Sequence, residues 1–302
     1  MTSRGKHLKK LNIRCYVVLM NFKYRPFFNQ MQASPGDGCR KENQMPKFSA
    51  NLTLLFTEVD FPDRFEKAAK AGFKAVEYMF PYSWPAAELA EKLEENGLKQ
   101  VLYNLPAGDW EAGERGIACL PGREQEFREG VLLALEYAKA LRCPALNCLA
   151  GLTPPNLPRE QVMETLKNNL EFAARTLEKE GVKLMVEALN SKDIPGFHLV
   201  GSKDVIDLIH EVGHSNLFFQ YDIYHMQRME GDLVNTLRAL MDRIGHIQLA
   251  DNPGRHEPGT GEIHFANLFR AIDEAGYPGW IGCEYNPAAG TEAGLGWLDS
   301  YR

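Results

Sequence analysis

The sequence lacks several features that would assign it to a class at once. No apolar run approaches the roughly 18 residues that a membrane-spanning helix requires, since the run 15–20 is interrupted too soon. Its six cysteines form no CxxC pair, which favours free thiols in a reducing compartment over a disulfide framework. Neither a GxGxxG turn after the first apolar run nor a GxSxG elbow occurs. We therefore expect a soluble, cytoplasmic protein without a membrane partner, and neither a dinucleotide-binding sheet nor a serine hydrolase.

Positive charge is scarce beyond the first 45 residues. Residues 1–45 hold nine Lys and Arg against two acids, a net charge of +7; the totals of 34 and 40 then leave 25 against 38, or −13, for residues 46–302. Binding to a phosphate backbone depends on Lys and Arg, so we expect no nucleic-acid partner. The basic segment 1–45 has no clear period. It is interpreted as an extension that is disordered, artefactual or an organelle-targeting sequence, ahead of a single domain at 46–302.

Short apolar runs alternate with helical patterns from residue 48 onward. This alternation predicts parallel strands joined by crossover helices, and eight such units in about 255 residues fit a closed (β/α)₈ TIM barrel. Proline or glycine marks the boundaries of predicted helices within 62–72 and 88–97, and Ser202 is expected to cap a helix over 203–212. The predicted strands are 48–56, 75–80, 99–105, 145–150, 183–189, 217–222, 245–250 and 280–285.

The fifth to eighth predicted strands each carry an acid or amide among apolar neighbours. In a barrel of this kind the C-terminal ends of the strands converge on one mouth, so these side chains are expected to meet. Buried carboxylates are costly unless a cation compensates for them, and an all-oxygen ligand set suits a divalent metal, Mg²⁺ or Mn²⁺. The alternative is that the acids form buried ion pairs with Arg or Lys. The predicted metal ligands are Glu187, Asp222, Gln248 and Glu284.

Two glutamates flanking one metal ion indicate a proton-transfer reaction. A metal ion can hold both oxygens of a 2-hydroxy-carbonyl compound and stabilise an enediolate. Glu187 and Glu284 are then the catalytic pair, one removing a carbon-bound proton and the other returning it. This chemistry is aldose–ketose isomerisation or sugar epimerisation.

Three further residues are predicted to bind substrate. His225 follows Asp222 by three residues, where an imidazole can donate to a substrate oxygen. Arg255 lies in the loop after the seventh strand, where a guanidinium can grip a carboxylate. Glu77, on the second strand, either reaches the same mouth or braces a neighbouring side chain. The long, glycine-rich loop 104–116 is a candidate lid.

One string matches a zinc-protease motif, His210-Glu211-Val212-Gly213-His214. The motif requires both histidines on one face of a continuous helix, but Gly213 is a helix stop signal. The segment also leads into the sixth strand, which places it at the end of the barrel opposite the strand-end acids. We interpret the match as a coincidence.

Several long motifs occur in order between about residue 46 and the C-terminus, and together they resemble the hydroxypyruvate isomerase family of the xylose-isomerase-like superfamily. The segment 1–45 lies outside this resemblance. The motifs are Asn104-Leu105-Pro106-Ala107-Gly108-Asp109, Pro121-Gly122-Arg123-Glu124, Gln220-Tyr221-Asp222-Ile223-Tyr224-His225-Met226-Gln227 and Gly282-Cys283-Glu284-Tyr285.

The resemblance implies interconversion of hydroxypyruvate and 2-hydroxy-3-oxopropanoate (tartronate semialdehyde) in glyoxylate metabolism. It implies that Glu187 and Glu284 are the proton donor/acceptor pair and that the same two residues bind the metal with Asp222 and Gln248. In the similar ketose 3-epimerases the third ligand is typically His, so Gln248 favours the isomerase branch. A 2-oxo-tetronate isomerase and a ketose 3-epimerase are the alternatives, and the assembly state stays open, a homo-oligomer included.

Two rivals come from other functional classes. A metal-dependent endonuclease on the same barrel would need a basic groove and a histidine-rich multi-zinc site, and the net charge of −13 argues against it. A barrel that kept the fold but only binds a ligand is the second rival. Failure to bind any divalent metal would favour it.

Overall fold

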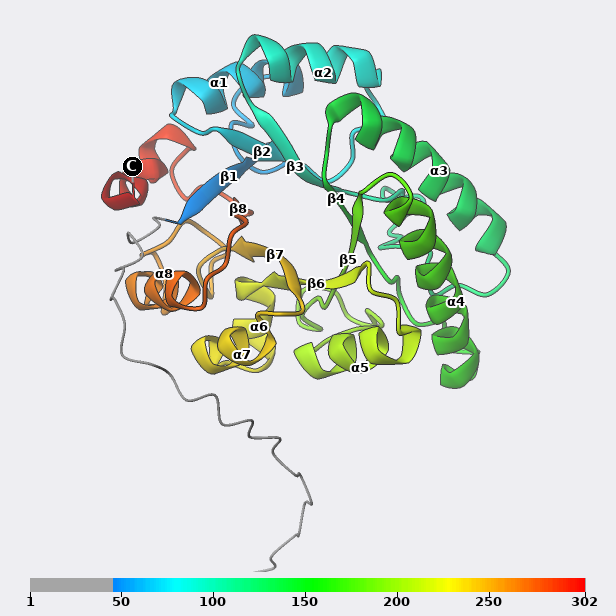
Figure 1. Cartoon of the computed structure of the whole chain (residues 1–302). Helices are drawn as coiled ribbons and strands as arrows, with labels where there is room; N and C mark the ends of the chain where they lie inside the picture. The colour runs from blue at the N-terminus through cyan, green and yellow to red at the C-terminus, as the bar shows by residue number, and fades with distance from the viewer. Residues whose placement is uncertain (1–45, 302) are drawn as a thin grey trace, which may run out of the picture. The chain divides into compact units, whose positions relative to one another are not determined.

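The chain folds into a closed barrel of eight parallel strands. The computed structural model describes residues 46–301, so the interpretation of residues 1–45 falls outside the described residues. The strands pair in sequence order and β8 pairs with β1, which closes the barrel (Figure 1). The predicted (β/α)₈ TIM barrel is confirmed. The strands are β1 Lys47–Asn51, β2 Ala75–Glu77, β3 Lys99–Asn104, β4 Ala145–Cys148, β5 Lys183–Glu187, β6 Leu217–Asp222, β7 Ile244–Leu249 and β8 Trp280–Cys283.

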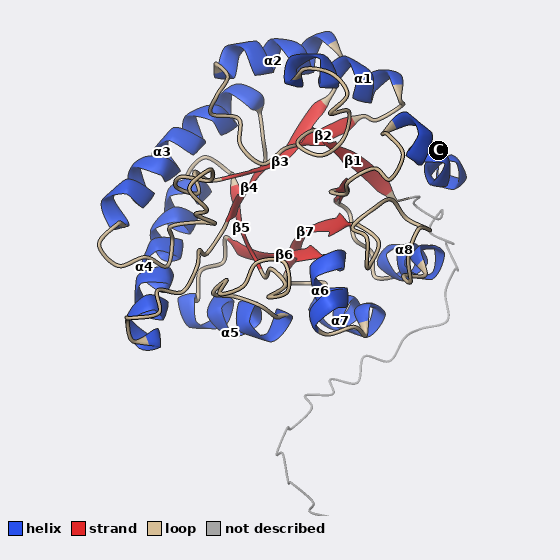
Figure 2. Ribbon diagram, turned by 180° about the vertical axis from the view of Figure 1, so that it is seen from behind, coloured by secondary structure: helices blue, strands red, loops and turns tan. Residues whose placement is uncertain are grey.

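Helices form a ring around the outside of the barrel (Figure 2). The 3₁₀ helix η2, which follows β8, lies between α8 and α1 in both views and completes this ring. None of the helices within residues 46–301 is long and apolar enough to cross a membrane. The helices are η1 Phe61–Asp63, α1 Arg64–Lys70, α2 Ala86–Glu95, α3 Glu124–Leu141, α4 Arg159–Glu178, α5 Ser202–Val212, α6 Ile223–Met229, α7 Leu233–Leu240, α8 Phe265–Glu274 and η2 Glu292–Tyr301.

All eight predicted strands are present, and each begins within one residue of its predicted start. Most of them end earlier than predicted, and the first ends at Asn51 rather than at residue 56. The residues beyond it remain apolar because they are buried beneath the loops of the barrel mouth: Leu52, Leu55 and Phe56 are all at most 2% exposed. An apolar run therefore reports burial, and only part of it is strand.

The predicted cap of helix α5 was wrong. Gly201 occupies the N-cap position and Ser202 is already the first helical residue. The backbone N–H and the hydroxyl of Ser202 both donate to the Glu230 carboxylate, at 2.5 and 2.7 Å. An acid distant in sequence thus satisfies the helix start that a local hydroxyl was expected to satisfy.

The HExxH string does not form a metal-binding helix face. Helix α5 ends at Val212, and Gly213 has a φ of 66°, in the left-handed region. His210 is exposed, whereas His214 lies past the helix end, 3.9 Å from the Glu178 carboxylate. The two histidines therefore do not share a helix, as expected for a chance match.

A small apolar cluster lies toward the amino-terminal end of the barrel. It contains Val101, Ala145 and Met185 and packs against Phe218 and Trp280. Gly245, on β7, leaves room for this packing, because a Cβ added there would lie 2.5 Å from the Met185 sulfur and 2.8 Å from the Phe218 Cβ. The cluster separates the polar centre of the barrel from the amino-terminal end.

Replacing Gly245 with alanine is expected to destabilise the fold by about 1–3 kcal/mol, the usual cost of overpacking a filled core. Urea unfolding measures the free energy directly. Gly296→Ala is the matched control, because a Cβ there meets nothing within 4 Å. Equal stability of the two variants would contradict the proposed packing at Gly245.

Candidate functional site

The carboxyl-terminal mouth of the barrel is polar, and every strand or its C-terminal edge contributes to it. All of the contributing side chains are at most 8% exposed. Burial of so many polar groups requires that they bond one another, and they form a nearly continuous network around the mouth. The residues are Asn51, Glu77, Asn104, Asn147, Glu187, Gln220, Asp222, Gln248 and Glu284.

Glu187 ends strand β5, and one of its carboxylate oxygens accepts hydrogen bonds from neighbouring side chains. Asn147 and Gln220 donate their side-chain amides to Oε2, at 2.9 and 3.0 Å. No protein group donates to Oε1 within residues 46–301. Burial raises the pKa of Glu187 well above its ordinary value, and the neighbouring carboxylates of Glu284 and Asp222 raise it further. One oxygen of this residue is therefore available to a ligand or a proton.

Asp222 ends strand β6 and is also the N-cap of helix α6. Its Oδ1 accepts the backbone N–H groups of Tyr224 and His225, at 2.7 and 3.1 Å. Its Oδ2 is buried and has no hydrogen-bond partner among the described residues. Ligand atoms of Glu187, Asp222 and His225 lie within 4.8 Å of one another. A buried carboxylate oxygen without a donor, beside a second carboxylate, fits a bound cation.

Gln248, on β7, forms hydrogen bonds through both atoms of its side-chain amide. Its Oε1 accepts from Gln220 Nε2 at 2.7 Å, and its Nε2 donates to Glu77 Oε1 at 2.8 Å. A carbonyl oxygen has two lone pairs, so Oε1 can accept from Gln220 and still bind a metal. Gln220, which the sequence reasoning missed, precedes Asp222 by two residues and hence shares its face of β6. The two-residue spacing from Asp222 is the sequence signal that could have identified Gln220 as part of the mouth.

Glu284 follows β8 and, among residues 46–301, is the one acid of the mouth that pairs with an arginine or lysine. Its Oε2 accepts from Arg255 Nη2 at 3.0 Å, and its Oε1 accepts from the Asn51 amide at 3.3 Å. Burial raises the pKa of Glu284 to about 8, against the opposing effect of Arg255 and with further raising by Asp222. Arg255 thus lies in the loop after β7, as predicted, and its guanidinium donates to Glu284, an acid of the mouth.

Arg255 is held by its loop in an unusual conformation. Its φ of 55° lies in the left-handed region, its N–H donates to the Asp251 carbonyl, and its guanidinium lies 5.2 Å from the centre of the Tyr224 ring. Burial disfavours its charge, but Glu284, Asp222 and Glu187 together raise its pKa above the ordinary value. The Nε of Arg255 is buried and has no acceptor. Within residues 46–301 that N–H is thus left without a partner.

The hydrogen bonds of His225 fix which ring nitrogen carries the proton. Nδ1 faces two donors of Asn190, the backbone N–H at 3.2 Å and the side-chain amide at 2.7 Å. The Asn190 amide is oriented by its own carbonyl, which accepts the N–H groups of Lys192 and Asp193. Burial lowers the pKa of His225 to about 4, so the ring is neutral and its proton is on Nε2. A protonated Nε2 cannot bind a metal.

Glu77 lies at the centre of the barrel rather than at its rim. Its carboxylate accepts from Ser49 at 3.0 Å and Gln248 at 2.8 Å and contacts His246 Nε2 at 2.9 Å. Gly282 permits this position, since a Cβ added there would lie 2.3 Å from Glu77 Oε1. These contacts favour the bracing role among the two that the sequence left open.

The donor set of the mouth fits a divalent metal ion. Metal ligation requires ionised carboxylates, and in that state Glu187, Asp222 and Glu284 contribute three negative charges, which Arg255, paired with Glu284, offsets only in part. The alternative of satisfied ion pairs accounts for Glu284 alone. Carboxylate and amide oxygens are the ligands that Mg²⁺ and Mn²⁺ prefer. The side chains at Glu187, Asp222, Gln248 and Glu284 therefore suit the metal that was predicted for them.

The predicted lid borders the mouth with aromatic residues. Trp110 packs against Phe80 with ring centres 5.1 Å apart, and the Arg115 guanidinium lies 4.1 Å from the Trp110 ring. At the end of this loop Gly116 touches the loop after β4, where a Cβ would lie 2.2 Å from the Leu149 carbonyl oxygen. The loop is thus fastened at one end, and its function as a lid stays a prediction.

In a TIM barrel the active site lies at the carboxyl-terminal ends of the strands, and in this chain that end carries the buried carboxyl groups of Glu187, Asp222 and Glu284. Residues 65–301 match the xylose isomerase-like TIM barrel family, and the chain belongs to that family. Hydroxypyruvate isomerase of Escherichia coli (strain K12) is 57% identical over 258 residues, which cover 85% of this chain and 100% of that protein.

Other relatives carry different names. The 2-oxo-tetronate isomerase of Cupriavidus necator is 48% identical over 257 residues, 85% of this chain and 99% of that protein. The crystal structure of a Brucella melitensis protein named AP endonuclease, family 2, superposes with a TM-score of 0.84 at 44% identity, over 85% of this chain and all of that one.

These likenesses confirm the family resemblance and the assignment of this chain as an enzyme, an isomerase of the hydroxypyruvate isomerase type. The roles of the individual site residues, the assembly state, the absence of a nucleic-acid partner and the localisation stay predictions.

The pH dependence of stability tests the buried carboxylates. The folded protein holds the pKa of Glu187 above its ordinary 4.5, so the protonated form stabilises the fold. This contribution to stability is complete below about pH 4.5 and is lost as the pH rises through the raised pKa. Glu284 contributes in the same way, and its contribution is lost as the pH rises through its pKa of about 8. We expect the Tm of metal-free protein in EDTA to fall between pH 5 and pH 9, and the fall to be smaller in Glu187→Gln.

Scanning calorimetry measures this slope, and exposed Glu91→Gln on α2 is the control that should follow the wild type. Adding Mg²⁺ at pH 8 should raise the Tm of the wild type more than that of Glu187→Gln. Identical slopes for the wild type and Glu187→Gln would show that Glu187 is ionised in the metal-free fold, contrary to its environment.

Proposed function

We propose that the enzyme interconverts hydroxypyruvate and 2-hydroxy-3-oxopropanoate, with Glu187 and Glu284 as the proton-transfer pair. The observation that carries the proposal is the burial of both glutamates in one barrel mouth, at the ends of β5 and β8, where the charge of Glu284 acts on Glu187. The 57% identity to a hydroxypyruvate isomerase over that protein's whole length supports the choice of substrate.

The reaction moves one carbon-bound hydrogen. A carboxylate removes a proton from C3 of hydroxypyruvate, and the electron pair forms the C2–C3 double bond of an enediolate while the C2 carbonyl electrons move to oxygen. A carboxylic acid then returns a proton to C2, the C3 oxygen becomes the aldehyde carbonyl, and the hydroxyl proton passes from the C3 oxygen to the C2 oxygen. Carboxyl groups with raised pKa values exchange protons readily near neutral pH.

We assign a divalent metal to Glu187, Asp222, Gln248 and Glu284, of which Asp222 and Gln248 serve only to hold it. When bound, the ion supplies positive charge beside the two substrate oxygens on which negative charge develops. The unpartnered Oδ2 of Asp222 and Oε1 of Glu187 support this assignment.

The remaining residues orient the substrate. His225 presents a neutral Nε2–H, which can donate to a substrate oxygen without transferring its proton. Arg255 keeps a buried Nε–H without an acceptor, which suits the substrate carboxylate. Glu77 positions Gln248 through the hydrogen bond at 2.8 Å and has no direct part in binding.

A 2-oxo-tetronate isomerase is the second candidate, because relatives with that name are up to 48% identical. It uses the same atoms of the reaction centre on a substrate one carbon longer. We do not propose an endonuclease, since the body carries −13 and carboxylates, not histidines, end the strands.

Glu187→Gln and Glu284→Gln are each expected to lower kcat for hydroxypyruvate by about 10²–10⁴-fold, the usual contribution of general acid–base catalysis. Glu91→Gln, on the surface of α2, should keep full activity. In deuterated water the wild-type product should carry deuterium at C2. Full turnover by either folded variant would exclude its glutamate as a proton carrier, and a product without deuterium would indicate a hydride shift instead.

Kinetics on both acids should separate the two candidate substrates. We expect kcat/KM for hydroxypyruvate to exceed that for 2-oxo-tetronate at least tenfold, as expected from roughly 1–3 kcal/mol for one extra carbon in a closed site. NMR of purified protein with Mn²⁺ follows both conversions. A higher kcat/KM for 2-oxo-tetronate would identify that acid as the substrate.

A further inference from the structure

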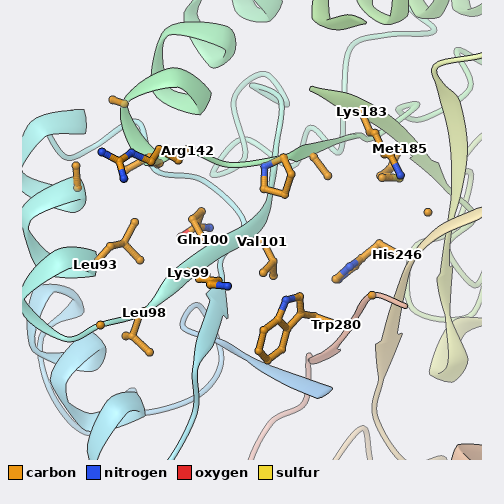
Figure 3. Close-up of a pocket in the computed structure, with 18 of the residues that line it drawn as sticks. Leu93, Leu98, Lys99, Gln100, Val101, Arg142, Lys183, Met185, His246 and Trp280 are labelled. Carbon is orange, nitrogen blue, oxygen red and sulfur yellow. The ribbon is translucent and has the colours of Figure 1, made fainter. Parts of the chain in front are cut away.

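A second cavity lies at the opposite end of the barrel from the carboxylates. Its volume is about 670 Å³, and it is formed at the amino-terminal ends of β3, β4, β5, β7 and β8 and by the ends of α2 and α3 (Figure 3). Cavities of this size accommodate small organic ligands. None of the four assigned metal ligands lines it. The proposed isomerase reaction therefore leaves this cavity without a function.

The charge of the cavity is opposite to that of the body. Lys99, Arg142 and Lys183 line it, with Glu94 as the one acid. None of the three cations forms an ion pair with any residue in the part of the chain that the structure describes. Residues 46–302 carry −13 overall, so three unpaired cations around one hollow are a local reversal of charge. Such a cluster attracts an anion.

The wall between the cations is apolar and aromatic. In Figure 3, Lys183 and Met185 lie at one end and Arg142 with Leu93 at the other, while Val101 and Trp280 lie between them. An elongated ligand with a flat apolar body can rest on this wall and still place an anionic group beside a cation. Neither inorganic phosphate nor a neutral hydrocarbon would use both features.

One buried polar atom in the wall lacks a partner. Gln100 is 3% exposed, and its Nε2 donates to the Leu102 carbonyl at 2.8 Å, whereas its Oε1 has no donor. A buried carbonyl oxygen without a donor is costly, and Gln100 lines the cavity. A ligand N–H or O–H group would satisfy it.

We propose that this cavity binds a small aromatic anion that carries a hydrogen-bond donor. Its carboxylate, sulfonate or phosphate lies beside one of the lysines, Lys99 or Lys183, its ring on Trp280 and Val101, and its N–H or O–H faces Gln100 Oε1. The site is independent of substrate binding at the carboxyl-terminal mouth.

The probe is 8-anilinonaphthalene-1-sulfonate, an aromatic anion with one N–H group, and its neutral counterpart is N-phenyl-1-naphthylamine. Titration of the full chain, followed by fluorescence and by calorimetry, should give one saturable site for the sulfonate and at least tenfold weaker binding of the neutral amine. Excess hydroxypyruvate should not displace the probe, because it binds at the other end. Displacement by hydroxypyruvate, equal affinity for both probes or no saturable binding would overturn the proposal.

The double variant Lys99→Glu/Lys183→Glu should weaken binding of the sulfonate at least tenfold, while Lys203→Glu on exposed α5 should not. Ala140→Trp, at an exposed position lining the cavity, should block the site sterically without a change of charge. Circular dichroism checks that each variant is folded. If the double variant does not fold, the affinity of Ala140→Trp for the sulfonate is the test. Unchanged affinity in the folded variants would overturn the proposal.

Discussion

The burial of the carboxyl groups of Glu187, Asp222 and Glu284 in one barrel mouth is the constraint on which the rest of this structure depends. Charged groups out of water must be bonded or neutralised. The strands accordingly supply amides, and Asn147 and Gln220 bind Glu187 while Asn51 binds Glu284. Within the part of the chain that the structure describes, Arg255 is the one arginine or lysine that pairs with an acid of the mouth. The amides hold the acids in place without cancelling their charge, and the charge that remains is what suits the mouth to a divalent ion.

Strand register is the second requirement, because the network passes through the inside of the barrel. Glu77 receives side chains from β1 and β7, and Gln220 joins β5 to β7. A slip of one residue would turn each of these side chains outward. The apolar cluster around Met185 lies at the other end of the same strands. One set of eight strands thus provides a polar mouth for chemistry and, at its amino-terminal end, the apolar wall of the cation-lined cavity.

The fold and most residues of the mouth could be predicted from the sequence, and the reasons lie in particular residues. Apolar runs predict buried strands wherever these lie, and an acid within such a run, as at Glu187, stands out. Gln220 did not stand out, because it lies inside β6 and the acid Asp222 ends that strand. The cap of α5 failed because Glu230, distant in sequence, replaces a local hydroxyl. The cation-lined cavity depends on loops and strand starts from five parts of the chain, a juxtaposition that no local pattern encodes.

The contact between Gly282 and Glu77 has a consequence for the history of this enzyme. Position 282 has no space for a side chain while Glu77 is held by Ser49, Gln248 and His246. A relative with a larger residue at 282 must therefore have shortened or moved the side chain at 77, although the two positions are separated by most of the domain. These two sites should covary in descent, and a mutation at either one should be tolerated only in the genetic background of the other.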